Sequence, residues 1–135
     1  MPSEDANKVW DLIENIPICM LVTHDGDEVR SRPMVAFARR DDDAVHFLTD
    51  ARCHKDEDVA RDPRACLVFV DPAGQTFLSI SGQAAVSNDS ARIRELWSDY
   101  PGDPAIRLLS VTPKDAEFWG APGRMISYVK MASAE

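Results

Sequence analysis

The sequence has no run of apolar residues that approaches the ~20 needed for a membrane-spanning helix. Its N-terminal segment, MPSED, carries two acidic residues and lacks a secretory hydrophobic region. The three cysteines, Cys19, Cys53 and Cys66, are odd in number and have no CxxC spacing, which argues against a disulfide framework and against a zinc site. These absences favour a cytoplasmic protein with no metal and no membrane association.

Basic residues are also in deficit. The chain has 15 Lys and Arg against 23 Asp and Glu, a formal net charge of −8 and a sequence pI of about 4.8. A nucleic-acid-binding protein needs a basic face that displaces counterions, so this balance argues against such a partner and against an anionic membrane surface. Any local cluster of cations therefore stands out from its background.

The fingerprints of several common catalytic sites are missing. The sequence contains no phosphate-binding P-loop and no dinucleotide-binding glycine pattern. Ser79 and Ser81 alternate along a predicted strand, but no histidine or acid stands in a triad relation to them. The histidines, His24, His46 and His54, are scattered without metal-ligand spacing.

The 135 residues predict one domain, and the hydrophobic fraction of 44% allows a real core. Helical spacing predicts a helix that ends at Pro17 and shorter helices over 50–61, 90–100 and 114–119, with Asn88 or Ser90 as the cap of the third. Strands are predicted over 18–23, 28–39, 44–49, 65–70, 76–87 and 106–112, with 125–130 as a further candidate. Short strands linked by hairpins predict a mainly β (α+β) fold, an antiparallel barrel with helices on its rim.

Two residues inside predicted strands carry positional information. Pro33 cannot donate to a strand ladder, so it predicts an edge strand or a bulge. Gly82 lies within the long strand 76–87, and a glycine there often marks a bulge or a bend at a barrel corner.

A cationic cluster is predicted where the 50–61 helix begins. Cations are normally disfavoured at a helix N-terminus, yet His54 and Lys55 lie there. Their position is explained if an anion binds between them and the free backbone N–H groups. Thr49, at the end of the preceding strand, offers a hydroxyl to the same anion. The alternative is that His54 and Lys55 are exposed residues that balance nearby acids.

A second group of cations lies on the preceding strand. Arg30, Arg32 and Met34 share one face by the two-residue period of a strand. The planar arginine fork suits a phosphate or a carbonyl-rich ring, although a solvated strand face is an equally acceptable interpretation. Together the two groups predict a cradle for a phosphate attached to a flat ring.

A resemblance to a known family is carried by several segments in order. They are RSRPM (30–34), FLTD (47–50), HK (54–55), RDPR (61–64), FVDP (69–72), QTFLSISG (75–82), ELW (95–97) and AEFW (116–119). The chain resembles the pyridoxamine 5′-phosphate oxidase-like FMN-binding split barrels, and within them the general stress protein 26-like branch. The resemblance covers nearly the whole chain.

This resemblance implies a six-stranded antiparallel split barrel that forms a homodimer, with FMN in grooves between the subunits. It also implies a set of FMN-contacting residues: Arg32, Pro33, Met34, Phe47, Leu48, Thr49, His54, Lys55, Thr76, Phe77 and Trp97. Among these, Trp97 would approach the flavin ring from the partner subunit.

By the same analogy, the segment 32–34 lies along the isoalloxazine ring or the ribityl chain. The segment 47–49 presents backbone and hydroxyl contacts, and His54 and Lys55 hold the phosphate. Thr76 and Phe77 stand where the family places further flavin contacts.

The chain departs from the oxidases proper in two places. Phe77 stands where those enzymes tend to have a glutamine, and the tail offers little beyond Arg124 and Lys130 to grip a substrate phosphate. The sequence therefore predicts an FMN-dependent oxidoreductase of unknown substrate rather than a true pyridoxamine 5′-phosphate oxidase. Two alternatives remain open: a non-catalytic flavin-sensing stress protein, and a split barrel that binds a deazaflavin or haem.

Overall fold

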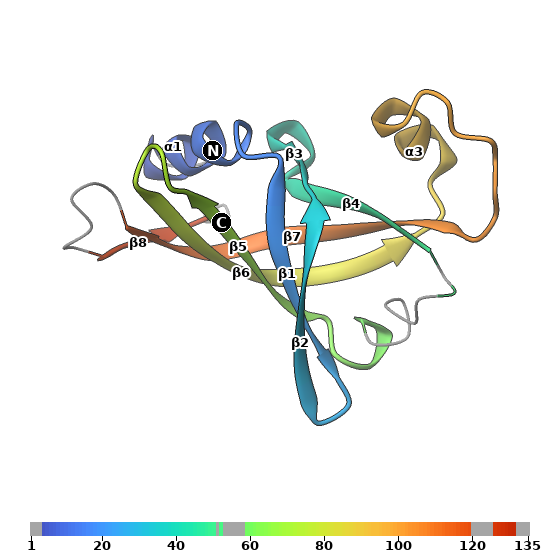
Figure 1. Cartoon of the computed structure of the whole chain (residues 1–135), viewed down its shortest axis with the longest axis horizontal. Coiled ribbons are helices and arrows are strands. Elements are labelled where there is room, and N and C mark those ends of the chain that lie inside the picture. The colour runs from blue at the N-terminus through green and yellow to red at the C-terminus, as the bar shows by residue number, and fades with distance from the viewer. Residues whose placement is uncertain (1–3, 51, 53–58, 120–125, 132–135) are drawn as a thin grey trace.

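A computed structural model of the chain describes residues 4–50, 52, 59–119 and 126–131 (Figure 1). The elements in chain order are α1 (Glu4–Ile13), β1 (Ile18–Asp25), β2 (Glu28–Val35), β3 (Phe37–Arg39), the 3-10 helix η1 (Arg40–Asp42), β4 (Ala44–Asp50), β5 (Arg64–Asp71), β6 (Thr76–Ser87), α3 (Ser90–Leu96), β7 (Ile106–Trp119) and β8 (Ile126–Lys130). Residues 59–61 are also helical.

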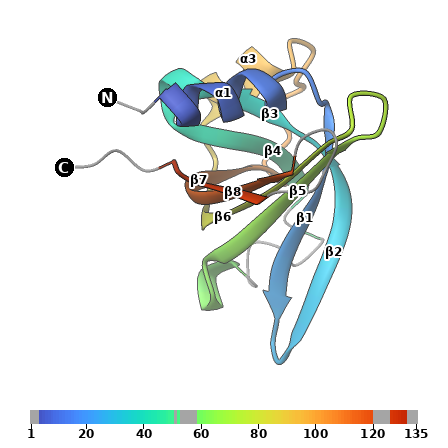
Figure 2. The same ribbon diagram turned by 90° about the vertical axis from the view of Figure 1, so that its left-hand side faces the viewer.

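The strands form one antiparallel sheet of eight strands in the order β2-β1-β5-β6-β7-β4-β3, with β8 paired to β7. The two strands at the ends of this order, β2 and β3, are separated in sequence by Ala36 alone. A sheet whose ends are joined by one residue must roll up, and Figure 2 shows this curl. The predicted mainly β, antiparallel split-barrel architecture is confirmed, although the sheet has eight strands and not the six expected, because the segment 28–39 divides into β2 and β3 and β8 adds to β7.

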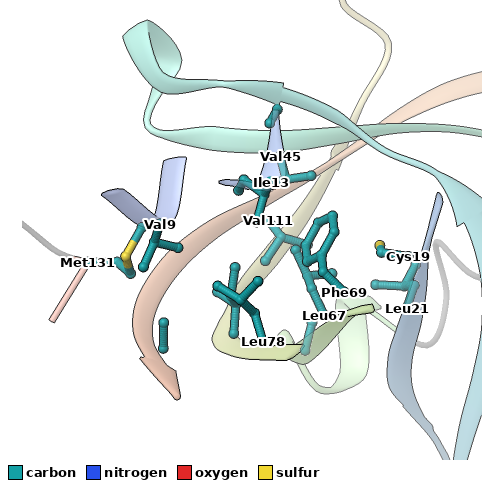
Figure 3. Packing of buried hydrophobic residues seen from close by; sticks show 14 of the residues in the cluster. Val9, Ile13, Cys19, Leu21, Val45, Leu67, Phe69, Leu78, Val111 and Met131 are labelled. Atoms are coloured by element: carbon teal, nitrogen blue, oxygen red, sulfur yellow. The ribbon is translucent and has the colours of Figure 1, made fainter. Parts of the chain in front are cut away.

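The core fills the inside of the curl, and α1 covers one end of it (Figure 2). Burial alternates along β1, β5 and β6, as expected for strands with one face inward. Leu21, Leu67 and Phe69 point inward from the strands, and Ile13 meets them from α1 (Figure 3). Each such buried side chain stabilises the fold by roughly 1.5–3 kcal/mol.

The strands differ from the sequence-based prediction by more than a residue or two at their ends in two places. The predicted strand 28–39 divides at Ala36, whose N–H donates to the carbonyl oxygen of Pro17 at 2.8 Å. The helix predicted over 114–119 was wrong, because β7 continues through Pro113 to Trp119 and pairs with both β6 and β8. Pro113 is tolerated inside this strand because it lies beside a bulge.

The positional predictions for Gly82 and Pro33 are confirmed. The register of β6 against β7 shifts between Ser81 and Gly82, so Gly82 does mark a bulge. Pro33 lies on β2, which ends the strand order and is therefore an edge strand.

The helices are shorter than the sequence suggested. The third ends at Leu96, and its cap is neither Asn88 nor Ser90 but Asp89, whose carboxylate accepts from the backbone N–H of Arg92 at 3.1 Å. Of the helix predicted over 50–61, the described residues are helical at 59–61, and Arg52 lies in a 3-10 turn.

Candidate functional site

Arg32 projects from β2 toward the inner face of the sheet. It is the cross-strand partner of the fully buried Leu21, and partners in an antiparallel pair face the same side. Its Nη1 donates to Oγ1 of Thr23 at 3.4 Å, a long contact that uses little of the guanidinium's donor capacity. Among the described residues, no carboxylate pairs with Arg32. A half-buried cation without an acid, in a protein of net charge −8, is available to an anionic ligand.

Arg30 behaves differently from Arg32. Its Nε lies 2.7 Å from Oδ2 of Asp25, and its side chain is 59% exposed. The interpretation of a solvated strand face therefore holds for Arg30 but not for Arg32.

Thr49 lies near the end of β4, on the same inner face as the buried Phe47. The residue is 6% exposed, and within the described part of the chain its Oγ1 has no hydrogen-bond partner. A buried hydroxyl without a hydrogen-bond partner lowers the stability of the fold by about 1–3 kcal/mol. A ligand atom that forms a hydrogen bond with the Thr49 hydroxyl would recover this loss.

The remaining residues of these two segments divide between the faces. Met34 is half-buried and packs against the core, whereas Pro33 between it and Arg32 is exposed on the outer face. Phe47 is fully buried, so its side chain belongs to the core, and Leu48 points the other way and is half-buried. The structure thus brings Arg32, Met34 and Thr49 to the inner side of β2 and β4, which contact each other across the split of the barrel.

Thr76, Phe77 and Trp97 lie away from that inner cluster. Thr76 begins β6, and its hydroxyl donates to the carbonyl oxygen of Gly74 at 3.3 Å. Phe77 is 39% exposed on the outer face, in a cross-strand row with Val70 and Trp119. Within one chain these side chains do not complete the cradle.

Trp97 directly follows α3 and is 37% exposed. Its ring centroid lies 5.7 Å from that of Tyr100 in a tilted arrangement. An exposed indole held by a second ring presents a flat apolar surface.

His54 and Lys55 lie outside the described residues, so the predicted phosphate cradle at a helix N-terminus stays a prediction. The neighbouring Asp50 is described. Nε of Arg52 donates to Oδ1 of Asp50 at 2.7 Å, and this hydrogen bond lowers the pKa of the Asp50 carboxyl to about 2. The charge that Asp50 would bring to an anion site is therefore neutralised locally by Arg52.

Two features escaped the sequence-based reasoning. Thr23, which accepts from Arg32, alternates with the buried Leu21 on β1, and the two-residue period would have placed it inside. His46 is buried between Asp42 and Ser110, beside a cleft of about 730 Å³ on the side of the barrel that carries α3. The contact between His46 and Ser110 joins residues 64 positions apart, and no local pattern in the sequence predicts it.

The described residues contain no group of three or more His, Cys, Asp or Glu side chains that could hold a metal ion. None of the helices in the described ranges combines the length and apolar character that a bilayer crossing requires.

Residues 4–135 match the model of the family described as "Pyridoxamine 5'-phosphate oxidase like". The chain belongs to this family. The predicted resemblance is thereby confirmed, and the match covers the cradle segments as well as both halves of the sheet. No curated protein matches the sequence.

Solved structures share the architecture of this pyridoxamine 5′-phosphate oxidase-like chain. A protein from Clostridium acetobutylicum related to general stress protein 26 of B. subtilis has a TM-score of 0.77 at 20% identity, over 93% of this chain and 94% of that chain. A pyridoxamine 5′-phosphate oxidase-related, FMN-binding protein from Nostoc punctiforme has a TM-score of 0.68 at 17% identity, over 92% and 84%. A haem-binding protein from Mycobacterium smegmatis has a TM-score of 0.73 at 15% identity, over 97% and 60%. At these identities the likeness shows the fold alone.

Proposed function

We propose that this chain binds FMN and works as a homodimeric flavin oxidoreductase with the cofactor at the subunit interface. The observation that carries the proposal is the buried, unpaired hydroxyl of Thr49. It lies on the same inner face of the barrel as Arg32, a cation without a carboxylate partner among the described residues.

FMN offers hydrogen-bond acceptors to both groups, on its phosphate and on its carbonyl-rich ring. Phosphate oxygens accept two parallel N–H hydrogen bonds from a guanidinium, and they also accept a hydrogen bond from a hydroxyl. Thr49 immediately precedes the segment that holds His54 and Lys55, so the three would act on the same anion. Family membership, and the FMN-binding protein among the structural neighbours, support a flavin as the carrier of that phosphate.

The outer face of the sheet supports a dimer. Ile18 and Val35 are cross-strand partners and are 49% and 50% exposed, and the partners Val70 and Phe77 are 46% and 39% exposed. Contiguous apolar surface of this kind is characteristic of interaction sites. A second subunit would cover it, and its Phe77 and Trp97 would reach a cofactor held by the first subunit.

When bound, the cofactor supplies hydride or electron transfer. The chain's own part is to hold and orient it. The Arg32 guanidinium offers charge to an anionic acceptor, the Thr49 hydroxyl donates a hydrogen bond, and the Met34 side chain excludes water beside a ring. Among the described residues no side chain is positioned as a general base, so we assign no catalytic residue.

Haem is the less favoured cofactor. A haem iron needs an axial ligand, and the buried His46 already uses both ring nitrogens, toward Ser110 at 2.7 Å and Asp42 at 2.8 Å. His24 is at the surface, with its Nε2 3.8 Å from a carboxylate oxygen of Asp62.

The absorbance spectrum of freshly purified protein tests the cofactor. We expect flavin bands and no Soret band, and a Soret band would overturn the proposal in favour of haem.

Consumption of reduced nicotinamide cofactor by the holoprotein separates an oxidoreductase from a flavin-sensing protein. Light-scattering mass at several concentrations tests the dimer, which Phe77→Asp should weaken.

The phosphate assignment is tested by titrating FMN into apoprotein variants. Arg32→Ala and Lys55→Ala should each weaken binding roughly 10- to 100-fold, the loss expected for a hydrogen bond to a charged group of about 1.5–3 kcal/mol. Arg30→Ala is the matched control, because that exposed arginine pairs with Asp25 and should leave the affinity unchanged. Equal FMN affinities for all three variants would contradict the phosphate assignment.

A further inference from the structure

A network of ion pairs connects α3 to the barrel through Asp42, at the end of η1. Oδ2 of Asp42 lies 2.8 Å from Nε2 of His46 on β4, and Oδ1 accepts from Nη2 of Arg92 on α3 at 2.8 Å. The two oxygens of one carboxylate are thus divided between the barrel and the helix.

On the barrel side of this network, His46 is buried and both of its ring nitrogens have hydrogen-bond partners. The His46 side chain is 7% exposed, and its Nδ1 lies 2.7 Å from Oγ of Ser110 on β7. Because a carboxylate is only an acceptor, Nε2 carries a proton and donates to Asp42, while Nδ1 forms a hydrogen bond with the Ser110 hydroxyl. The position of Asp42 is therefore set from inside the sheet.

The helix side has a second, parallel link. Nε of Arg39 on β3 donates to Oε1 of Glu95 on α3 at 3.1 Å, and Nη1 of Arg92 lies 3.8 Å from Oε2 of the same carboxylate. The Asp42 and Glu95 carboxylates both line the cleft of about 730 Å³ between α3 and the barrel.

These polar links matter because α3 has little else to hold it. It has seven residues, and Ile93 is its one buried residue. A helix this short is unstable in isolation and depends on tertiary contacts. Trp97 follows α3 directly, with its backbone N–H donating to the carbonyl oxygen of Ile93 at 2.8 Å, so the indole moves with the helix.

We infer that Asp42 is a positioning residue: by bridging His46 and Arg92, it fixes α3 on the barrel and thereby sets the place of Trp97. The anchoring of α3 is independent of any ligand. Its consequence for the cofactor rests on the proposed function, in which Trp97 contacts the flavin across the subunit interface.

The decisive variant is Asp42→Asn, which keeps the shape of the side chain. Its amide oxygen can still accept from Nε2 of His46, so no buried donor is orphaned. Its amide nitrogen, however, presents a donor to the donor-only guanidinium of Arg92, and the link to α3 is lost. Asp11→Asn is the matched control, since Asp11 pairs with Arg40, whose ion pairs are with Asp11 in α1 and Glu14 just after it, and not with α3.

Hydrogen exchange in the full-length protein measures the anchoring. In Asp42→Asn we expect exchange of the peptide 89–97 to rise roughly tenfold while β4 and β7 keep their protection. The emission of Trp97, obtained by difference from the Trp97→Phe protein, should shift to the red. Asp11→Asn should do neither. Equal effects in both variants, or faster exchange throughout the sheet, would overturn the inference.

A second variant keeps the test independent of the folding of the first. Arg92→Gln removes the ion pair with Asp42 from the helix side, together with the contact to Glu95 inside α3, and it should reproduce the changes in exchange and emission. The double variant Asp42→Asn/Arg92→Gln should add little to either single one, because both remove one interaction. Additive effects would show that the two residues act separately and would overturn the bridge.

FMN titration then separates this inference from the proposed function. If wild type binds FMN, Asp42→Asn should weaken binding severalfold, and the difference should vanish in a Trp97→Phe background. Unchanged affinity despite a loosened α3 would overturn the link from Asp42 to the cofactor. If wild type binds no FMN while α3 still loosens in Asp42→Asn, the anchoring stands and the proposed function fails.

Discussion

Gly82 of β6 lies directly against the backbone of Thr112 in β7. A Cβ atom on Gly82 would come within 2.3 Å of the carbonyl oxygen of Thr112 and within 3.0 Å of its carbonyl carbon. Backbone atoms in a paired strand cannot move aside as a flexible side chain can. The bulge between Ser81 and Gly82 therefore needs a residue without a side chain at position 82. The bend of the sheet at this point depends on that glycine.

Gly82→Ala should destabilise the protein by about 2–3 kcal/mol, because the clash forces a backbone shift in the longest strands of the sheet. Urea unfolding followed by circular dichroism measures the change. Gly74→Ala is the control: its Cβ would meet Oδ2 of Asp71 at 2.7 Å, and that carboxylate end can rotate away, so its cost should stay below about 1 kcal/mol. A cost for Gly82→Ala no larger than for Gly74→Ala would contradict the close approach.

The fold could be predicted where the signal is local. The apolar runs 18–23 and 65–70, and the placement of Pro33 and Gly82, predicted the strands, the edge and the bulge. The prediction of a helix over 114–119 was wrong because a proline such as Pro113 ordinarily ends a strand. The bulge that lets the proline stay in the strand comes from the pairing of β6 with β7, which a single segment does not reveal.

In the site, too, the features that follow from a local pattern could be predicted, and the contacts between separate elements could not. The two-residue period placed Arg32 and Met34 on one face, and the structure agrees. It could not separate Arg30 from Arg32, since the difference is an ion pair with Asp25 at the hairpin. Likewise, the Asp42–His46–Ser110 contacts join three elements and follow only from the folded sheet. The roles of all eleven predicted residues toward FMN, from Arg32 to Trp97, stay predictions.

Thr49→Val should have opposite effects on stability and on binding. In the apoprotein the substitution removes an orphaned buried hydroxyl, so stability should be unchanged or rise by about 1 kcal/mol. FMN affinity should fall about 10-fold or more if that hydroxyl donates to a phosphate. Thermal unfolding and FMN titration measure the two. Thr23→Val is the control: its hydroxyl accepts from Arg32, so its loss should lower stability. A destabilised Thr49→Val would mean that the hydroxyl has a partner.

Cys19 and Cys66 should differ sharply in reactivity. Burial, with a smaller contribution from the nearby Cys66, raises the pKa of the Cys19 thiol to about 12. At pH 8 only about one Cys19 in ten thousand would be a thiolate, the reactive form. Cys66 is half-buried and lines a cleft of about 380 Å³.

In a Cys53→Ser background, a small alkylating reagent at pH 8 should therefore modify Cys66 first and Cys19 only after unfolding. Peptide mass spectrometry follows both sites, and Cys66→Ser is the control that should leave no fast-reacting thiol. Rapid labelling of Cys19 in the folded protein would contradict its burial.

Acid should destabilise the protein through two carboxylates held by arginines two residues away. Hydrogen bonds from Arg52 lower the pKa of Asp50 to about 2, and those from Arg64 hold the pKa of Asp62 well below its usual range. A depressed folded-state pKa means that the stabilisation is complete above the unfolded value, near 3.9, and is lost as the pH falls below it. The expected window therefore runs from about pH 4 down to about pH 2 and continues lower for Asp62.

The midpoint of thermal unfolding, measured across that window, should fall less steeply in Asp50→Asn and in Asp62→Asn than in wild type, because an amide has no proton to gain. The change should be modest, since both pairs are open to solvent, and it should shrink further in high salt. Asp27→Asn, in the exposed turn between β1 and β2, is the control and should follow the wild-type curve. Parallel curves for all four proteins would mean that the arginine contacts are not maintained in solution.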